Sequence, residues 1–214
     1  SSNYLIDLGC IEAAITSSTK AIIPVHLFGC PVNMEALGLI AKRHNLKIIE
    51  DCAQAAGSRW RDIPVGGWGD VGCFSFFPTK NLGAAGDAGA VTTKDSLLAQ
   101  KIRELAIHGM PKRYLHTKFG YNSRLDSIQA AILNIKLPRL SKWVSKRKEI
   151  ANYYIDKLGN IEGIKIPSIT SDIDTGHSWN QFVIRILDDD KLVSDVKANK
   201  RDLFKLELQK HGVH

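Results

Sequence analysis

The stretch KAIIPVHLFGCPVNMEALGLIAKRHNLKIIED, residues 20–51, decides the fold. It opens with the apolar run 20–26, typical of a buried strand, and closes with a second such run at 46–51. Between them, Asn33 can cap a helix that continues to about His44, because apolar side chains recur there at helical spacing. A strand, a helix and a strand with short connections form a βαβ unit, which implies parallel pairing and a right-handed crossover.

Further elements extend this unit along the first part of the chain. Apolar runs and helical spacing predict strands at 71–77 and 88–93, helices at 9–19 and 95–108, and a Gly- and Pro-rich loop or hairpin at 57–70. Asp95 or Ser96 can cap the second of these helices. The alternation of strands and helices predicts an α/β fold with a mainly parallel sheet.

The second part of the chain has a different pattern. We expect a loop at 110–123, a helix from about 125 to 158 with a break near Pro138, a turn and short strand at 159–167, a strand at 178–187 and a last helix at 199–211. The pattern changes near 140–160. We therefore expect a large domain over 1–140 and the start of a smaller α+β domain over 141–214.

The chain carries 29 basic and 22 acidic residues, a formal net charge of +7. Part of the excess lies at 136–148, where basic residues are interleaved with apolar ones near helical spacing, as on the solvated face of an amphipathic helix. The same charge could draw in a polyanionic substrate such as a nucleotide diphosphate. No nucleic-acid-binding module accompanies it, which disfavours DNA or RNA as a partner.

The sequence also indicates the compartment. No run approaches the roughly 18 apolar residues of a membrane span, and the first residues do not resemble a signal peptide. Cys10, Cys30, Cys52 and Cys73 are scattered without a C-x-x-C pair. We therefore expect a cytoplasmic protein with reduced thiols, no metal site and no membrane partner.

Two charged residues follow strands where an open α/β sheet binds its ligand, at the carboxyl ends. Asp51 ends the strand 46–51, and Lys80 lies three residues past the strand 71–77. A lysine amine can form an imine with the aldehyde of pyridoxal phosphate (PLP), and a carboxylate can pair with the ring nitrogen of that cofactor. On spacing alone, a plain salt bridge between Asp51 and Lys80 is the structural alternative.

The order of several motifs resembles one family, the PLP-dependent nucleotide-sugar aminotransferases of the perosamine-synthase-like kind, which work on keto-sugars. The motifs are IPVHLFG at 23–29, EDCAQA at 50–55, GD at 69–70, FSFFPTKNLG at 74–83, GDAG at 86–89, HG at 108–109 and GYNSRL at 120–125. The resemblance covers about residues 9–160 and continues weakly beyond. It implies a fold-type I enzyme, with PLP bound by the large domain.

The resemblance assigns the central chemistry to two residues. Lys80 would form the Schiff base with PLP and then move a proton from the Cα of the amino donor, by resemblance glutamate, to C4′ of the cofactor. Asp51 would keep the ring nitrogen protonated. Family members with histidine in place of the lysine remove a hydroxyl instead, so Lys80 favours transamination.

Four further residues take roles from the same resemblance. Gln54 would reach the cofactor ring near its phenolic oxygen, and Ser75 would donate to the phosphate. Asn122 would reach the phosphate in the neighbouring subunit, which implies a homodimer, and Arg124 would contact substrate or the interface. Their structural alternatives are a helix start for Gln54, an outward-facing side chain for Ser75 and a turn for Asn122.

Family members are considerably longer, and their first segment carries a Gly-Thr turn for the phosphate and an aromatic residue stacked on the ring. We therefore expect this chain to be truncated at both ends. The leading hypothesis is an aminotransferase; the alternative is a truncated or degenerate member that serves as a non-catalytic binding or structural subunit. A dinucleotide-binding oxidoreductase is disfavoured, because Gly83, Gly86 and Gly89 lack the G-x-G-x-x-G spacing. The sugar and the carbon aminated depend on pocket shape and stay open.

Overall fold

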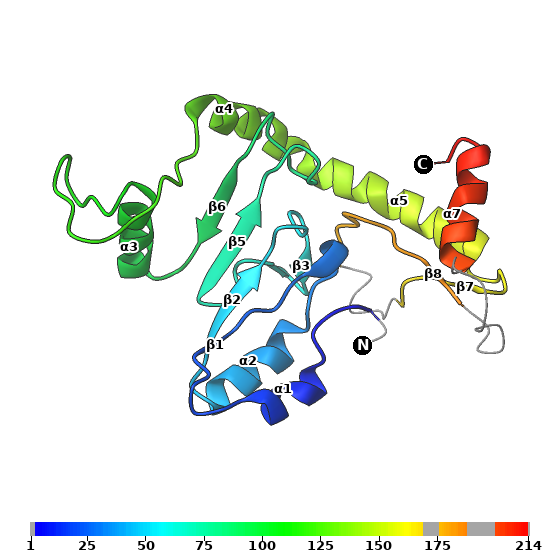
Figure 1. The fold of residues 1–214 in the computed structure, drawn as a ribbon, viewed down its shortest axis with the longest axis horizontal. Helices are drawn as coiled ribbons and strands as arrows, with labels where there is room; N and C mark the ends of the chain where they lie inside the picture. The colour runs from blue at the N-terminus through cyan, green and yellow to red at the C-terminus, as the bar shows by residue number, and fades with distance from the viewer. Residues whose placement is uncertain (1–2, 169–175, 188–199, 214) are drawn as a thin grey trace.

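The computed structural model describes residues 3–168, 176–187 and 200–213. Its centre is a sheet in the order β1-β2-β5-β6 (Figure 1). These strands are β1 (Ala21–Ile22), β2 (Lys47–Asp51), β5 (Val71–Ser75) and β6 (Gly89–Thr92). The first three are parallel, and β6 is antiparallel to β5. The predicted mainly parallel α/β sheet is thus confirmed, with one antiparallel strand.

Side-chain caps fix the starts of the helices in this half. The helices are α1 (Leu8–Ala14), α2 (Met34–Arg43) and α3 (Ser96–Ala106), and a 3₁₀ turn, η1, spans Leu27–Gly29. Asn33 accepts from the backbone N–H of Ala36, and Asp95 accepts from those of Leu97 and Leu98, so both predicted caps are confirmed.

The first helix is shorter than the predicted 9–19. Ile15 is already extended, and the hydroxyls of Thr16 and Thr19 accept hydrogen bonds from the backbone N–H groups of Ser18 and Thr16. Such local side-chain bonds offer the backbone an alternative to the helix, which therefore ends at Ala14.

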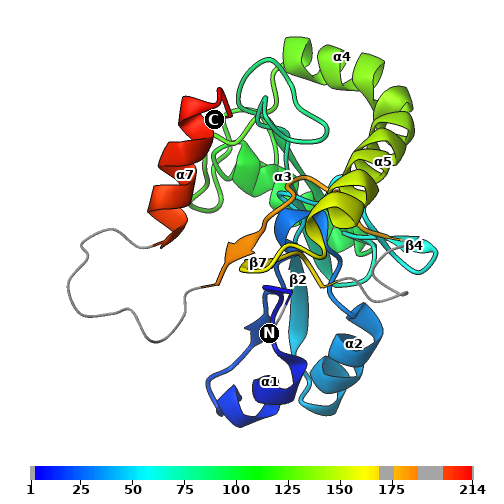
Figure 2. The same ribbon diagram turned by 90° about the vertical axis from the view of Figure 1, so that its right-hand side faces the viewer.

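The two faces of the sheet differ in what covers them. Along β2, Ile48 and Glu50 are buried, whereas Ile49 and Asp51 are half-buried and, by strand alternation, point to the opposite face. Figure 2 shows α2 and α5 on one side of β2. The main core packs on the Ile48 side, with Met34 and Leu37 of α2 fully enclosed. The Asp51 side is the open side.

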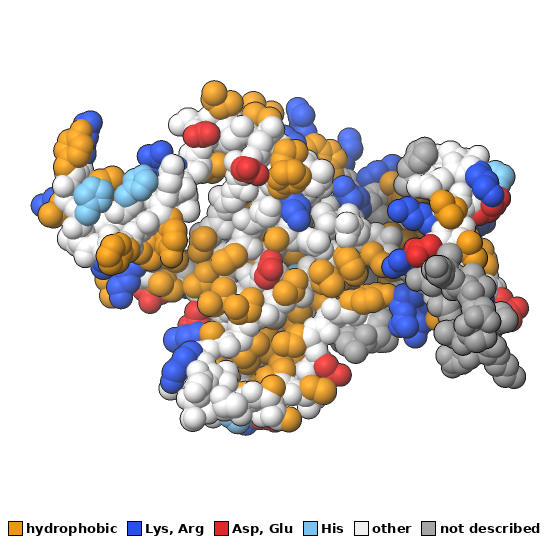
Figure 3. All heavy atoms as spheres, viewed as in Figure 1, with side chains coloured by type: hydrophobic (Ala, Val, Ile, Leu, Met, Phe, Trp, Pro, Cys, Tyr) orange, Lys and Arg blue, Asp and Glu red, His pale blue; other side chains and the backbone are white. Residues whose placement is uncertain are grey.

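Hydrophobic side chains gather over the sheet on the open side (Figure 3). Ile23, Val25, Phe77 and Val91 are among the exposed large apolar residues there.

Among the described residues, no helix is both long and apolar enough to cross a bilayer.

The remaining elements follow the predicted pattern in most places. A hairpin of β3 (Arg59–Trp60) and β4 (Ile63–Pro64) fills the predicted loop region. The long helical stretch is broken at Pro138, giving α4 (Ser127–Lys136), the 3₁₀ turn η2 (Leu137–Arg139) and α5 (Leu140–Leu158). Then come β7 (Ile164–Lys165), antiparallel to β8 (Arg185–Ile186), and α7 (Lys200–Lys210). The domain boundary at 140/141 stays a prediction, and it falls at the start of α5.

The predicted strand at 178–187 is wrong over most of its length, because only Arg185–Ile186 pairs in a ladder. The backbone of Ser178 and Gln181 donates instead to the carbonyls of Gly29 and Phe28 in the irregular loop after β1. The alternating sequence pattern therefore reflects packing against that loop and not a sheet.

Candidate functional site

The candidate residues gather where β2 and β5 end. Both strands point toward α4 and α5 (Figure 1), and Asp51 of β2 lies opposite Cys73 of β5 in the parallel register. Ser75 is two residues beyond Cys73, so Asp51 and Ser75 belong to the same, open face of the sheet. Lys80 then lies in the turn that follows β5.

A short turn carries Lys80 back toward β6. The backbone N–H of Lys80 donates to the carbonyl of Phe77 at 2.9 Å, and that of Ala84 donates to Phe76 at 2.8 Å. A side chain at Gly83 would collide with the carbonyl of Pro78, so glycine is required for this closure. The Lys80 side chain is half-buried, and its amine has no hydrogen-bond or ion-pair partner among the described residues.

The salt-bridge alternative does not hold. Asp51 and Lys80 both lie within the described residues, and no ion pair joins them there. One oxygen of Asp51 accepts from the backbone N–H of Ala53 at 3.0 Å, which leaves the second oxygen for another donor. The carboxylate and the amine therefore share the open edge of the sheet without neutralising each other.

Gln54 and Ser75 each keep a donor available. The Oε1 atom of Gln54 accepts from the backbone N–H of Phe28 at 2.7 Å, so its amide nitrogen is the group that can reach a ligand. The Ser75 hydroxyl accepts from the Phe77 N–H at 3.3 Å, and its own proton remains free to donate.

A wide cavity of about 1220 Å³ opens beside these residues, over β5 and β6 and against α3. It brings together Ser75, Lys80 and Arg124, whereas Asp51, Gln54 and Asn122 do not line it. Asn122 is exposed and forms an isolated bridge with Ile107. Tyr121, Ser123 and Asp87 are among the other polar residues that line it, and the sequence pattern indicated no role for these three.

Residues 1–213 match the model of the DegT/DnrJ/EryC1/StrS aminotransferase family. The chain belongs to this family. It is 42% identical over 210 residues to the UDP-N-acetyl-3-dehydro-alpha-D-glucosamine 3-aminotransferase of Acidithiobacillus ferrooxidans, an alignment that covers 98% of this chain and 53% of that protein.

Solved structures of similar proteins agree in fold. The structure of S. venezuelae DesV in complex with a ketimine intermediate superposes with a TM-score of 0.90 at 38% identity, covering 100% of this chain and 54% of that one. NtdA from Bacillus subtilis with bound cofactor PMP gives a TM-score of 0.78 at 36% identity, covering 87% and 42%. The chain spans about half the length of these relatives.

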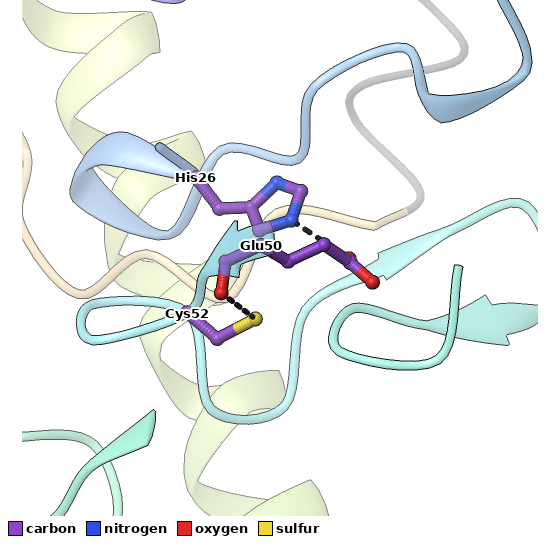
Figure 4. Close-up of side chains that lie close together, drawn as sticks. All are labelled: His26, Glu50 and Cys52. Atoms are coloured by element: carbon purple, nitrogen blue, oxygen red, sulfur yellow. Dashed lines mark hydrogen bonds and ion pairs between the residues drawn. The ribbon is translucent and has the colours of Figure 1, made fainter. Parts of the chain in front are cut away.

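Directly behind the candidate site of this aminotransferase-family chain lies a buried polar cluster of His26, Glu50 and Cys52 (Figure 4). His26 and Glu50 are both 0% exposed, and His26 Nε2 lies 3.0 Å from a Glu50 oxygen. The Nδ1 atom of His26 accepts from the backbone N–H of Val32, so the imidazole is neutral and donates through Nε2.

Hydrogen-bond donors of this protein occupy both oxygens of the Glu50 carboxylate. Besides His26, it accepts from the backbone N–H groups of Gly66, Trp68 and Gly69 at 2.7–2.9 Å. Burial raises the pKa of Glu50, but the hydrogen bonds from His26, Gly69 and Gly66 outweigh burial and hold that pKa below its usual value. The lone pairs a metal would need are thus engaged, and the cluster is a structural brace.

Sequence reasoning missed this brace, although a signal was present. Glu50 alternates with Asp51 on β2, so if Asp51 faces the ligand then Glu50 faces the core. A carboxylate in a core requires several donors. His26 lies within the motif at 23–29, and only the fold shows that it is one of those donors.

The cysteines give a simple test of this packing. Burial raises the pKa of the Cys30 thiol to about 12, and burial together with the carboxylates of Glu50 and Asp51 raises that of Cys52. Cys10 is exposed. We expect Ellman's reagent to modify Cys10 rapidly in the native chain, and Cys30 and Cys52 only after urea is added, because thiolates react and thiols do not. Peptide mass spectrometry identifies the sites; rapid native labelling of Cys52 would contradict the packing.

Proposed function

We propose that this protein transfers an amino group from an amino acid, glutamate by family resemblance, to a nucleotide-linked keto-sugar with PLP as its cofactor. The observation that carries the proposal is that the Lys80 amine, which has no partner among the described residues, and the Asp51 carboxylate both stand where adjacent parallel strands end. The relative from Acidithiobacillus ferrooxidans is named for 3-amination of such a sugar, and the matched NtdA structure binds PMP, the amine form of PLP.

When bound, PLP supplies an aldehyde and a ring that withdraws electrons from the carbon to be deprotonated. Lys80 would hold the cofactor covalently and later carry the proton between the Cα of the donor and C4′. The free oxygen of Asp51 would accept from the ring nitrogen and keep it protonated. The amide nitrogen of Gln54 would donate to the phenolic oxygen, and the hydroxyl of Ser75 to the phosphate.

The exposed residues belong to the less direct part of the proposal. Asn122 would donate to the phosphate held by the neighbouring copy in a homodimer, which its exposure permits. Arg124 lines the cavity without a described partner and would contact the anionic substrate.

The four free cysteines support a cytoplasmic location, because reducing compartments keep thiols unpaired.

The proposal is tested by incubating the purified chain with PLP, reducing with borohydride and locating the pyridoxyl label by mass spectrometry. We expect one label on Lys80, and none at that position or elsewhere in Lys80→Ala, because Lys80 is the one lysine among the described residues that line the cavity. A label on another lysine overturns the assignment. A chain that takes no label favours the non-catalytic binding or structural subunit.

A further inference from the structure

A buried polar network joins the turn of Lys80 to a segment that lies beyond α5. Asn81, next to Lys80, is only 7% exposed. Its Nδ2 atom donates to the carbonyl of Ser178 at 3.0 Å, and its Oδ1 atom accepts from Asn180 Nδ2 at 3.2 Å. Both ends of one carboxamide are therefore engaged by residues 178–180, which we call the clamp segment.

The clamp segment is itself fixed to the body of the protein. The Ser178 hydroxyl lies 2.7 Å from that of Ser58, which also donates to the carbonyl of Gly29. Arg147 of α5 donates to the carbonyls of Trp179 and Asn180 at 3.0 and 3.3 Å. These contacts do not involve Asn81, so the segment can act as an anchor for it.

The backbone shape of the clamp segment points the same way. Trp179 has a φ of +50°, a left-handed conformation that bulky residues rarely adopt, and its ring stacks on His177 at 3.8 Å. At Gly29, φ is +88°, and a side chain there would collide with the Ser178 hydroxyl. Such strain persists only where the surrounding contacts over-determine the conformation.

Lys80, by contrast, has few restraints of its own. Phe77, Pro78 and Thr79 before it are exposed. The turn is closed by the backbone bonds at Lys80 and Ala84 and by Lys136, which donates to the Gly83 carbonyl beyond Lys80. We propose that Asn81 is a positioning residue for Lys80. By binding the clamp segment, Asn81 fixes the position of the Lys80 amine relative to the part of the chain beyond α5. This inference rests on the proposed role of Lys80.

Two substitutions test the link without altering Lys80. Asn81→Asp keeps the size but places an oxygen against the Ser178 carbonyl, and Asn180→Ala removes the donor to Asn81. Asn134→Asp, on an exposed residue of α4, makes the same chemical change elsewhere. Leu37→Ala, in the fully buried core of α2, controls for a general loss of stability.

The first measurement is hydrogen–deuterium exchange of the peptide spanning 76–84, made without cofactor. We expect this peptide to exchange about tenfold faster in Asn81→Asp and Asn180→Ala, because the loss of one buried hydrogen bond makes local opening about tenfold more frequent. We expect no change in Asn134→Asp. The second is the fraction of Lys80 that takes the pyridoxyl label after borohydride, which we expect to fall about tenfold in the same two variants.

The outcomes separate the two proposals. Faster exchange with an unchanged label fraction would make Asn81 merely structural and overturn the inference, as would an unchanged exchange rate. An equal loss of label in Leu37→Ala would trace the effect to global stability and overturn it too. If the wild-type chain takes no label at Lys80, the proposed function fails, and the positioning role of Asn81 fails with it.

Discussion

Replacing Glu50 with glutamine is expected to lower the free energy of unfolding by about 3–6 kcal/mol, because two buried donors lose a charged acceptor and each such hydrogen bond contributes about 1.5–3 kcal/mol. The amide of glutamine would present N–H donors where His26 Nε2 and the Gly66 N–H now donate. The imidazole cannot compensate by changing tautomer, because its Nδ1 atom must accept from the backbone N–H of Val32. Urea denaturation of the two proteins measures the difference.

A matched control is Glu12→Gln. Glu12 is an exposed glutamate that pairs with Arg43 and His44. Its substitution should lower the free energy of unfolding far less than that of Glu50, because exposed ion pairs are screened by water. A comparable loss at both sites would contradict the brace.

The pH dependence adds a signed check on the Glu50 brace. The folded pKa of Glu50 lies below its ordinary value of 4.5, so its stabilising contribution is present above that pH. The contribution is lost as pH falls through the folded pKa. The difference in stability between wild type and Glu50→Gln should therefore narrow below about pH 4.5. A difference that stayed constant down to acid pH would contradict a charged Glu50.

Replacing Asp51 with asparagine is expected to do the reverse: to slow the proposed transamination strongly and leave stability almost unchanged. Removing one partner of a buried charged pair costs about 3–5 kcal/mol, which in a rate is roughly 10²- to 10⁴-fold. Among the residues that the structure describes, the native side chain makes one hydrogen bond, from the Ala53 N–H, and the oxygen of asparagine preserves it. The measurement is the rate at which the PLP-loaded protein converts to its amine form with glutamate.

Glu50→Gln and Asp51→Asn control for each other, because adjacent residues on a strand face opposite sides of the sheet. The free energy of unfolding of the Asp51 variant should lie within about 0.5 kcal/mol of the wild-type value, as is usual for substitutions outside the core. An Asp51→Asn protein that reacted within about threefold of the wild-type rate would show that this carboxylate does not serve the cofactor.

The sequence by itself determined the elements whose signals are local. Asn33 caps α2 and Asp95 caps α3, and both could be predicted because a cap depends only on the residues that follow it. The apolar runs around 20–26, 46–51 and 71–77 predicted strands, which the structure pairs in parallel so that Asp51 and Lys80 follow strand ends at one edge. Order and spacing of the motifs also led to the correct family.

Tertiary structure alone decided the contacts between distant segments. The alternation at 178–187 predicts a strand, yet Ser178 bonds to the loop at Gly29 and to Asn81. Likewise, only the fold brings His26 and the turn at 66–69 around Glu50. Local sequence records which groups need partners. Which partners they find depends on how the chain packs, because burial removes water as the alternative and leaves only what lies within hydrogen-bond reach.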